Sequence, residues 1–292
     1  MPISSRLRRV VDPLVLVELF VVSNIAFLAC DIFVAHSVNV FSHWAEWVPL
    51  AFSLVAPVAL VVAMALAGNI RPPSPLAGRQ LAAAQRLARV LGMTVGAASV
   101  AVGVAGLLWH LESQFFEEQT LRNLVYTAPF AAPLSYSGLG MLLLLDRMVP
   151  SDTVSWARWV VLLGLGGWVG NFALSLADHA QNAFFHWAEW IPVVASALAI
   201  GCLTIAAVAW RNRRFLHFCM GLMGLEIVVA LMGWGAHLHS IMASPMPTFW
   251  ERVVYSAPVF APLLFADLAL LTMIGLATLD ARAKEAELGN HG

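Results

Sequence analysis

Charge is scarce in this chain, and its scarcity excludes an ordinary soluble fold. Only 11% of the 292 residues are Asp, Glu, Lys or Arg, whereas 60% are hydrophobic, and the mean hydropathy is +0.80. A soluble domain of this size does not need so much apolar surface, because its exterior has to remain in contact with water. The composition therefore indicates an integral membrane protein whose apolar side chains face lipid.

Signatures of several other protein classes are missing. The three cysteines, Cys30, Cys202 and Cys219, all fall inside apolar segments, so no disulfide framework is expected. The sequence contains no nucleotide-binding loop, no nucleophile elbow and no separate soluble domain. Its formal net charge of −1 offers no basic excess for nucleic acid. The lipid bilayer is therefore the partner that the composition predicts, and no nucleic-acid partner is expected.

Long apolar runs are what the sequence has in abundance. They contain Leu, Ala, Val and Gly at helical lengths, without the short alternating strands of an outer-membrane barrel. Eight runs have about the length of a transmembrane helix, at residues 14–35, 48–67, 87–109, 124–145, 159–177, 190–210, 216–236 and 253–279. The first run is too long for a cleavable signal and lacks a small-x-small cleavage site. The sequence therefore predicts an all-α protein with eight transmembrane helices.

The distribution of Arg and Lys predicts the orientation of these helices. With both termini in the cytoplasm, the opposite face of the membrane holds only Arg122 and Arg252. The cytoplasmic face then holds 14 basic residues: Arg6, Arg8, Arg9, Arg71, Arg79, Arg86, Arg89, Arg147, Arg158, Arg211, Arg213, Arg214, Arg282 and Lys284. Positive charge is enriched in cytoplasmic loops. We therefore predict a multi-pass protein of a bacterial-type inner (plasma) membrane, with both termini cytoplasmic.

The periplasmic face is predicted to be acidic. Eight carboxylates fall on it or near it: Asp31, Glu46, Glu112, Glu117, Glu118, Asp178, Glu189 and Glu251. Together with the two arginines of that face, they leave a charge of about −6 when the histidines are neutral. Such a face attracts cations and repels anions.

A five-residue stretch, His-Trp-Ala-Glu-Trp, occurs twice, at residues 43–47 and 186–190. The likeness extends outward at a fixed offset of 143 residues, with nine identities in 17 positions between 36–52 and 179–195. Only two of the 22 preceding positions are identical. The flanking matches pair His36 with His179, Asn39 with Asn182, Phe41 with Phe184, and Pro49 with Pro192. A duplication alone does not explain why the likeness is concentrated in this polar and aromatic stretch.

A second set of matches lies at an offset of 129 residues. It pairs Tyr126, Ala128, Pro129, Ala132 and Pro133 with Tyr255, Ala257, Pro258, Ala261 and Pro262, and His110 with His239. Four helices in each half give both halves the same orientation. We therefore predict two tandem four-helix units, 14–146 and 157–279, related by a pseudo-twofold axis along the membrane normal. They lie between an inner tail, 1–13, and an inner C-terminal tail, 280–292.

The repeated residues include side chains that suit a transition metal. The predicted ligand sets are His36, His43, Glu46 and His110 in the first half, and His179, His186, Glu189 and His239 in the second. If the motif is helical, its His and Glu lie three residues apart on one face, a spacing that di-iron bundles use in reversed order. Imidazole and carboxylate suit iron, zinc or copper. Asn39, Asn182, Tyr126 and Tyr255 are predicted to support the ligands by hydrogen bonds.

Three other interpretations of these residues stay open. Trp at the membrane boundary is typical of an aromatic belt, in which His and Glu only pair with each other and cap helices. A b-type haem would use His36 with His110, and His179 with His239, as axial ligands. That arrangement leaves the His and Glu of the motif without a role. A separate cluster of imidazole and thioether groups suits copper, and it consists of His237, His239, Met242 and Met246.

Two acidic residues, Glu226 and Asp267, fall near the middle of predicted helices and have no basic partner nearby in the sequence. Intramembrane acids are costly and usually functional. Two classes of function follow. One is a membrane metalloprotein, either a metal-dependent oxidoreductase or its subunit, with other membrane or periplasmic redox subunits as partners, or a metal-handling protein. The other is an ion or proton-coupled transporter, in which Glu226 and Asp267 form the path.

Overall fold

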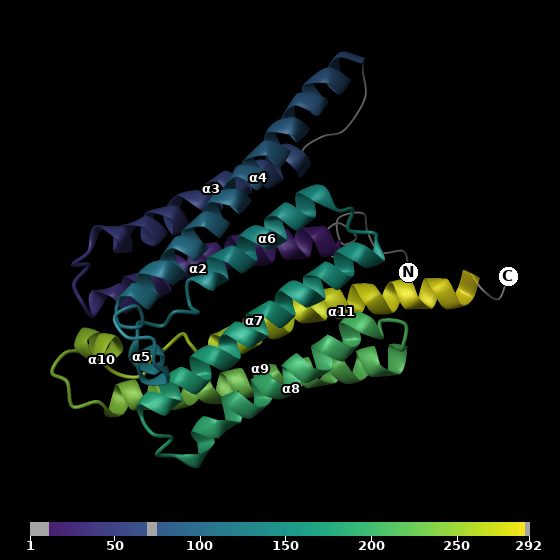
Figure 1. Cartoon of the computed structure of the whole chain (residues 1–292). Helices are drawn as coiled ribbons and strands as arrows, with labels where there is room; N and C mark the ends of the chain where they lie inside the picture. The colour runs from purple at the N-terminus through teal and green to yellow at the C-terminus, as the bar shows by residue number, and fades with distance from the viewer. Residues whose placement is uncertain (1–11, 69–74, 290–292) are drawn as a thin grey trace.

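The computed structural model describes residues 12–68 and 75–289, and these residues form an all-helical fold, as predicted (Figure 1). The first half of the chain contains α2 (Pro13–Ser37), α3 (Trp47–Gly68), α4 (Pro75–Glu112), α5 (Leu121–Tyr126) and α6 (Leu134–Met148). The second half contains α7 (Val154–Gln181), α8 (Trp190–Val208), α9 (Arg213–Ala243), α10 (Phe249–Tyr255) and α11 (Leu263–Gly289). Two short 3₁₀ helices, η1 (Trp44–Glu46) and η2 (Trp187–Glu189), precede α3 and α8.

Seven helices in the described part of the chain are long and apolar enough to cross a membrane, so the chain is a multi-pass membrane protein by helix length and hydropathy. The predicted span 124–145 is not continuous, because the chain divides there into α5 and α6. Helix α6 has 15 residues, or about 22 Å of helix, which is shorter than the roughly 30 Å hydrocarbon core. Pro129 and Pro133 lie in the break, where proline removes a backbone donor and disfavours a helical conformation in the residue before it.

The end of the chain shows the same kind of break. The predicted span 253–279 begins as the short α10, and α11 starts only after Pro258 and Pro262. Helix α11 then continues to Gly289, so most of the predicted tail 280–292 is helical. At the other terminus, Asp12 caps α2 by accepting a hydrogen bond from the Leu14 N–H at 3.0 Å. The rest of the predicted tail, residues 1–11, and the inner-loop base Arg71 lie outside the described residues.

The helices pack as two groups that follow chain order. In the first group, α3 packs against α2 and α4, and α4 packs against α6. In the second group, α7 packs against α8 and α11, and α9 packs against α11 and α8. Contacts of α6 with α7, and of α2 with α6 and α11, join the two groups (Figure 1). The core between them includes the fully buried Trp156 and Trp168.

Glycine permits the close approach of α4 and α6. A Cβ added at Gly140 on α6 would overlap the carbonyl oxygen of Gly96 on α4. The same face of α4 presents Gly103 to Ser137 of α6. In lipid, small residues let helix backbones approach and gain van der Waals contact that larger side chains would prevent. The Gly- and Ala-rich composition of α4 therefore determines how tightly α6 is held.

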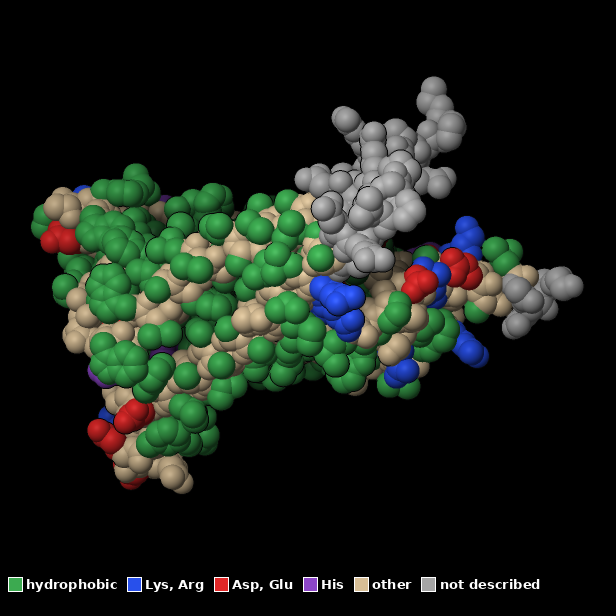
Figure 2. All heavy atoms as spheres, turned by 90° about the horizontal axis from the view of Figure 1, so that it is seen from above, with side chains coloured by type: hydrophobic (Ala, Val, Ile, Leu, Met, Phe, Trp, Pro, Cys, Tyr) green, Lys and Arg blue, Asp and Glu red, His purple; other side chains and the backbone are tan. Residues whose placement is uncertain are grey.

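The two ends of the molecule differ in polarity. We call the end that carries η1, η2, α5 and α10 the motif end, and the opposite end, where α2 begins and α11 finishes, the terminal end (Figure 1). Figure 2 shows hydrophobic side chains along the flanks of the helices, acidic side chains at the motif end, and basic and acidic side chains together at the terminal end. The apolar flanks have the exposure that lipid contact requires, since many large hydrophobic side chains are more than one third exposed.

Two polar contacts near the terminal end connect helices that are far apart in the sequence. Glu18 on α2 and Arg147 on α6 form an ion pair, and both side chains are largely buried. The neighbouring Asp146 accepts a hydrogen bond from the indole N–H of Trp156 on α7 at 2.8 Å. Because buried charges are stable only when they are paired, these contacts fix the register of α2, α6 and α7.

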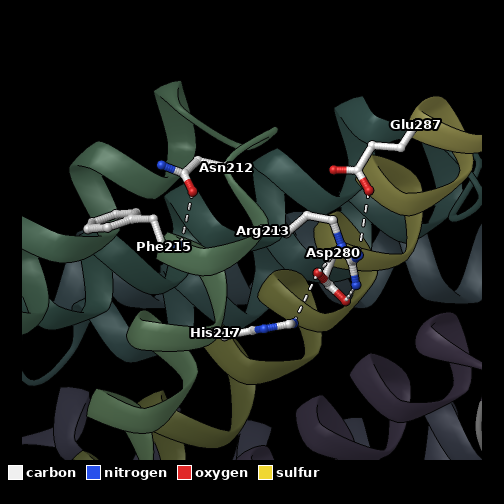
Figure 3. Close-up of polar contacts among 6 residues, drawn as sticks. All are labelled: Asn212, Arg213, Phe215, His217, Asp280 and Glu287. Atoms are coloured by element: carbon white, nitrogen blue, oxygen red, sulfur yellow. Dashed lines mark hydrogen bonds and ion pairs between the residues drawn. The ribbon is translucent and has the colours of Figure 1, made fainter. Parts of the chain in front are cut away.

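A second set of ion pairs joins α9 to α11 at the terminal end (Figure 3). Arg213 donates to both carboxylate oxygens of Asp280, at 2.8 Å from Nε and 3.2 Å from Nη2. His217 Nε2 lies 3.2 Å from Asp280 Oδ1, and Glu287 lies 3.5 Å from the guanidinium. Asn212 caps the start of α9 by accepting from the Phe215 N–H. The carboxylate of Asp280 attracts the guanidinium, and the bidentate contact also fixes the orientation of the guanidinium.

Candidate functional site

The turn after α2 and the turn after α7 contain backbone conformations that residues other than glycine rarely adopt. Val40 and Phe41 have φ values of +58° and +51°, and Ala183 and Phe184 have +56° and +49°. In both turns, the Phe N–H donates to the carbonyl of a histidine five residues earlier, His36 or His179, at 3.1 Å. Consecutive left-handed residues without glycine are strained. The turn therefore persists because other contacts hold it.

The histidine of the motif caps the 3₁₀ helix that follows it. His43 Nδ1 accepts from the Ala45 N–H at 3.3 Å, and His186 Nδ1 accepts from the Ala188 N–H at 3.2 Å. With Nδ1 used as an acceptor, the neutral ring carries its proton on Nε2. His43 and Glu46 were predicted to share one helical face, but His43 precedes η1 as its N-cap. His43 therefore acts as a helix cap in this structure, and in this tautomer its ring has no nitrogen lone pair free for a metal.

The first cluster joins the ends of α2 and α4 to η1. Glu46 Oε2 lies 3.8 Å from His36 Nδ1, and the His36 and His110 rings are 6.2 Å apart between centroids. The other carboxylate oxygen, Glu46 Oε1, accepts from Asn39 Nδ2 at 2.8 Å. Glu46 Oε2 itself is buried and has no hydrogen-bond partner among the described residues. Two imidazoles therefore lie close to one partly satisfied carboxylate.

The second cluster repeats the His–Glu pair of the first and the histidine contact to a proline carbonyl, but that contact uses a different histidine of α9 from the predicted one. Glu189 Oε2 lies 3.8 Å from His179 Nδ1 and is also buried without a partner in the described chain. His110 Nδ1 donates to the Pro129 carbonyl at 2.9 Å, and the corresponding contact to Pro258 is made by His237, at 2.7 Å. His237 therefore corresponds to His110.

The sequence match pairs His110 with His239, whereas the proline contact pairs it with His237, and the difference has a geometric reason. Successive residues of an α-helix are about 100° apart, so His237 and His239 project from nearly opposite sides of α9. His239 is exposed, whereas His237 is partly buried. The connection from His237 to Pro258 is 21 residues long and that from His110 to Pro129 is 19. A fixed offset taken from the prolines therefore misplaces the histidine by two positions.

The hydrogen bond to the proline carbonyl determines which nitrogen of the ring is free. A carbonyl oxygen only accepts, so Nδ1 of His110 and of His237 carries the proton. Nε2 then keeps its lone pair, which is the usual arrangement of a metal-ligating histidine held by a backbone carbonyl. Among the residues that the structure describes, no three His, Cys, Asp or Glu side chains are close enough to hold a metal ion without moving.

Aromatic rings surround each cluster. The ring of Phe41 lies 5.8 Å from that of His36 and 4.5 Å from that of Trp47. In the second half, Phe184 lies 6.1 Å from His179 and stacks on Trp190 at 4.0 Å. Trp44 and Trp187 are largely exposed, as the interpretation of an interfacial belt expects. The Phe side chains thus connect the histidines to the tryptophans of the motif.

The remaining predicted residues lie in varied positions. Tyr126 and Tyr255 end α5 and α10 and are about half exposed, and Asn182 is the C-cap of α7. In the proposed copper cluster, His237 Nδ1 is engaged by Pro258, while Met242 is 64% exposed. Of the two intramembrane acids, Glu226 is 1% exposed and Asp267 lies beside Asn24 of α2. The structure does not place these two acids in one cluster.

The comparisons with known proteins leave the site to be judged by its own geometry. No family model, no curated protein and no solved structure matches this chain. Sequence reasoning did not connect His237 with the second cluster, although it placed both His237 and His239 at the motif end of α9. No sequence signal identified His237, because the proline match leads to His239 instead.

Proposed function

We propose that this chain is a polytopic membrane metalloprotein with two metal sites at the motif end. The ligands are His36, Glu46 and His110 in one site and His179, Glu189 and His237 in the other. The strongest support is an observation that recurs in both halves. In each cluster, a buried carboxylate oxygen beside an imidazole has no hydrogen-bond partner in the described chain. Leaving such an oxygen unsatisfied is costly, and a cation would satisfy it.

The His–Glu distances fit two ligands of one ion, and the third histidine of each site has to move toward them on binding. Two ligands that are each about 2.1 Å from a tetrahedral metal lie about 3.4 Å apart. The His36–Glu46 and His179–Glu189 separations of 3.8 Å differ from that by a few tenths of an ångström. Three protein ligands leave a coordination position open, which is typical of a reactive site rather than a structural one. Imidazole and carboxylate ligands suit iron, zinc or copper.

The proposed architecture places the two sites symmetrically. We propose that residues 14–146 and 157–279 form two four-helix units related by a pseudo-twofold axis along the membrane normal, with α5 and α6 making an eighth crossing. Recurrence of the same turn, cap, ion pair and proline-carbonyl contact in both halves supports this arrangement. From the basic bias we propose that the termini lie in the cytoplasm and the motif end in the periplasm of a bacterial-type plasma membrane.

In this arrangement, the open position faces the periplasmic boundary, where an acidic surface collects cations. The protein would then serve as a metal-dependent oxidoreductase, as a redox subunit, or in metal handling. Haem b is the competing cofactor, because the 6.2 Å between the His36 and His110 rings is close to the roughly 6 Å spacing of two axial imidazoles on one iron. That reading leaves the unpartnered carboxylates unexplained, so we place it second.

The test is the metal content of detergent-purified protein together with its optical spectrum. We expect two metal ions per chain in the wild type, one in Glu46→Gln, one in Glu189→Gln and none in the double variant, because an amide retains the shape but not the charge. Glu112→Gln, an exposed carboxylate at the same end, is the matched control and should keep both ions. Binding should weaken as the pH falls through the histidine range, since only neutral imidazole ligates.

Three outcomes would contradict the proposal. They are wild-type protein that elutes as a folded species without metal, a double variant with unchanged metal content, and a Soret band in place of a non-haem signal. If the metal-free protein instead conducts ions in vesicles, the transporter becomes the better description, with Glu226 and Asp267 as its ionisable residues.

A further inference from the structure

A groove of about 450 Å³ runs between α8 and α9, from the boundary tryptophans to the middle of the helices. Trp187 and Trp190 line its upper part, and aliphatic side chains of both helices, including Val194, Leu198 and Leu225, line the rest. Those three residues are each more than half exposed. In a membrane protein such a groove opens to hydrocarbon, so its occupant arrives from the bilayer rather than from water.

One ionisable side chain, Glu226, lines the groove. It is 1% exposed, and its Oε2 has no hydrogen-bond partner among the described residues. Ser196, next to the lining residue Ala195 on α8, is also fully buried and has an unpartnered hydroxyl. Buried polar groups are normally satisfied. An unsatisfied carboxyl group in an otherwise apolar groove therefore points to a ligand that completes its hydrogen bonding.

The depth of Glu226 selects the chemistry of this ligand. It lies 13 residues from the start of α9, about 20 Å along the helix, and shares the groove with Val194 and Leu198, which lie four and eight residues after Trp190 at the start of α8, or about 6 Å and 12 Å. A phospholipid keeps its polar group at the membrane surface, above this depth. The ligand therefore has an apolar body, so that it stays within the hydrocarbon, and a polar group that can enter below the level of the headgroups.

We propose that the groove binds an isoprenoid quinone or quinol, with a ring oxygen hydrogen-bonded to Glu226. A carboxyl group accepts from the hydroxyl of a quinol and, when protonated, donates to the carbonyl of a quinone. Trp187 and Trp190 line the groove at the membrane boundary, and indole rings pack favourably against another aromatic ring. The volume of the groove is within the range of small-molecule sites.

This binding site does not depend on the metal proposal, because none of the six proposed ligands lines the groove. It does lie next to the second cluster. Trp190 stacks on Phe184 at 4.0 Å, and Phe184 lies 6.1 Å from the His179 ring. A quinone in the groove is thus separated from the cluster by two aromatic rings.

The experiment is a titration of detergent-purified full-length protein with decylubiquinone. Binding is measured by the quenching of tryptophan fluorescence, and Trp187 and Trp190, which line the groove, should contribute most of the quenched signal. We expect saturable binding by the wild type. Glu226→Leu should weaken it at least about tenfold, because the hydrogen-bonding group is lost. Leu198→Trp, which fills the groove from its lipid-facing wall, should weaken it to a similar degree while leaving the metal content unchanged.

The matched controls lie outside the groove. Asp267→Asn removes the other intramembrane acid, and Val58→Trp adds the same bulk on the exposed face of α3. Both should bind decylubiquinone with wild-type affinity. Thermal melting of each variant shows whether it is folded, and if Glu226→Leu does not fold, Leu198→Trp carries the test. Wild type that does not bind, groove variants that bind normally, or displacement by equimolar oleic acid, which would indicate a fatty-acid site, would each overturn the proposal.

Discussion

Midway along the helices, the two halves of the chain satisfy their polar groups in different ways. In the first half, the Tyr136 hydroxyl bonds to Ser53 and to the Pro49 carbonyl at 3.1 Å, and Ser99 donates to the Tyr136 carbonyl at 2.7 Å. In the second half, Ser196 corresponds to Ser53 at the offset of 143 residues, and Phe265 corresponds to Tyr136 at the offset of 129. Glu226 corresponds to Ser99 at an offset of 127, which is the offset between His110 and His237. Phe265 offers no hydroxyl, and the side chains of Ser196 and Glu226 have no partner in the described chain.

The motif ends, by contrast, are nearly the same in both halves. Each has a strained turn, a capping histidine, a His–Glu pair at 3.8 Å and a proline carbonyl bonded to a histidine. The difference teaches that the two regions answer to different requirements. In the first half, the polar groups midway along the helices bond to one another, whereas in the second half Ser196 and Glu226 keep unpartnered polar atoms within the described chain. Under the proposals above, the repeated contacts of the motif end would serve a metal, and the unpartnered groups of the second half would serve a ligand.

The largest expected effect concerns the likeness of the two motif ends. His237→Ala should remove the metal of the second cluster, because it deletes a proposed ligand, whereas His239→Ala should leave both ions in place. His110→Ala should remove the metal of the first cluster. Metal analysis of the three purified variants measures this, and equal loss in His237→Ala and His239→Ala would refute the assignment of His237.

A smaller effect is expected at the close approach of α4 and α6 in the first half. Gly140→Ala should lower the free energy of unfolding by about 1–3 kcal/mol, the usual cost of overpacking, because the new methyl group overlaps the Gly96 carbonyl. Gly138→Ala on the same helix meets no atom within 4 Å and serves as the control. Unfolding in mixed detergent micelles gives both values, and similar stabilities for the two variants would contradict the packing argument.

The difference between the two central regions can be reversed with single hydroxyl groups. Tyr136→Phe should destabilise the protein by about 1 kcal/mol, the net contribution of a typical hydrogen bond, because Ser53 loses its partner. If the second half follows the first at this depth, Phe265→Tyr will add a hydroxyl that can bond to Ser196 and the Pro192 carbonyl, and we expect it to be neutral or stabilising. Thermal melting compares them. A Phe265→Tyr variant that is less stable than Tyr136→Phe would mean that the halves are not equivalent at this depth.

The smallest effect is expected at the terminal end, where the second half has an ion-pair cluster that water can reach. Asp280→Asn removes the bidentate acceptor of Arg213. Because exposed ion pairs contribute little and are screened by salt, the melting temperature should fall only slightly, and less at high ionic strength. Asp146→Asn, in the buried contact with Trp156, should lower it more. The reverse order would contradict this ranking of the two contacts.

Helices were the most predictable part of the structure, because apolar length alone determines whether a segment can cross lipid. The same signal could not reveal the break at Pro129 and Pro133, since the flanking residues are apolar on both sides. Nor could it pair Glu18 with Arg147, whose contact depends on how α2 and α6 pack.

The candidate site was predictable in its residue types but not in its contacts. The repeated motif identified His36, Glu46 and their counterparts, and the structure brings these pairs together. The three-residue spacing of His43 and Glu46 fits a helical face and an N-cap equally well, and the structure has the cap. The side of α9 that faces the cluster depends on a helix rotation of about 200° between His237 and His239, which a sequence offset does not contain.

The left-handed turns at residues 40–41 and 183–184 also affect how fast a ligand can bind. Each such residue costs roughly 1–2 kcal/mol, and the cost is met when the protein folds. The rings of Phe41 and Phe184 are thereby held against His36 and His179 before any ligand arrives. A ligand then orders few additional groups on binding. The proposed metal ligands still have to move toward one another, so association of a metal ion should be slower than diffusion to the surface.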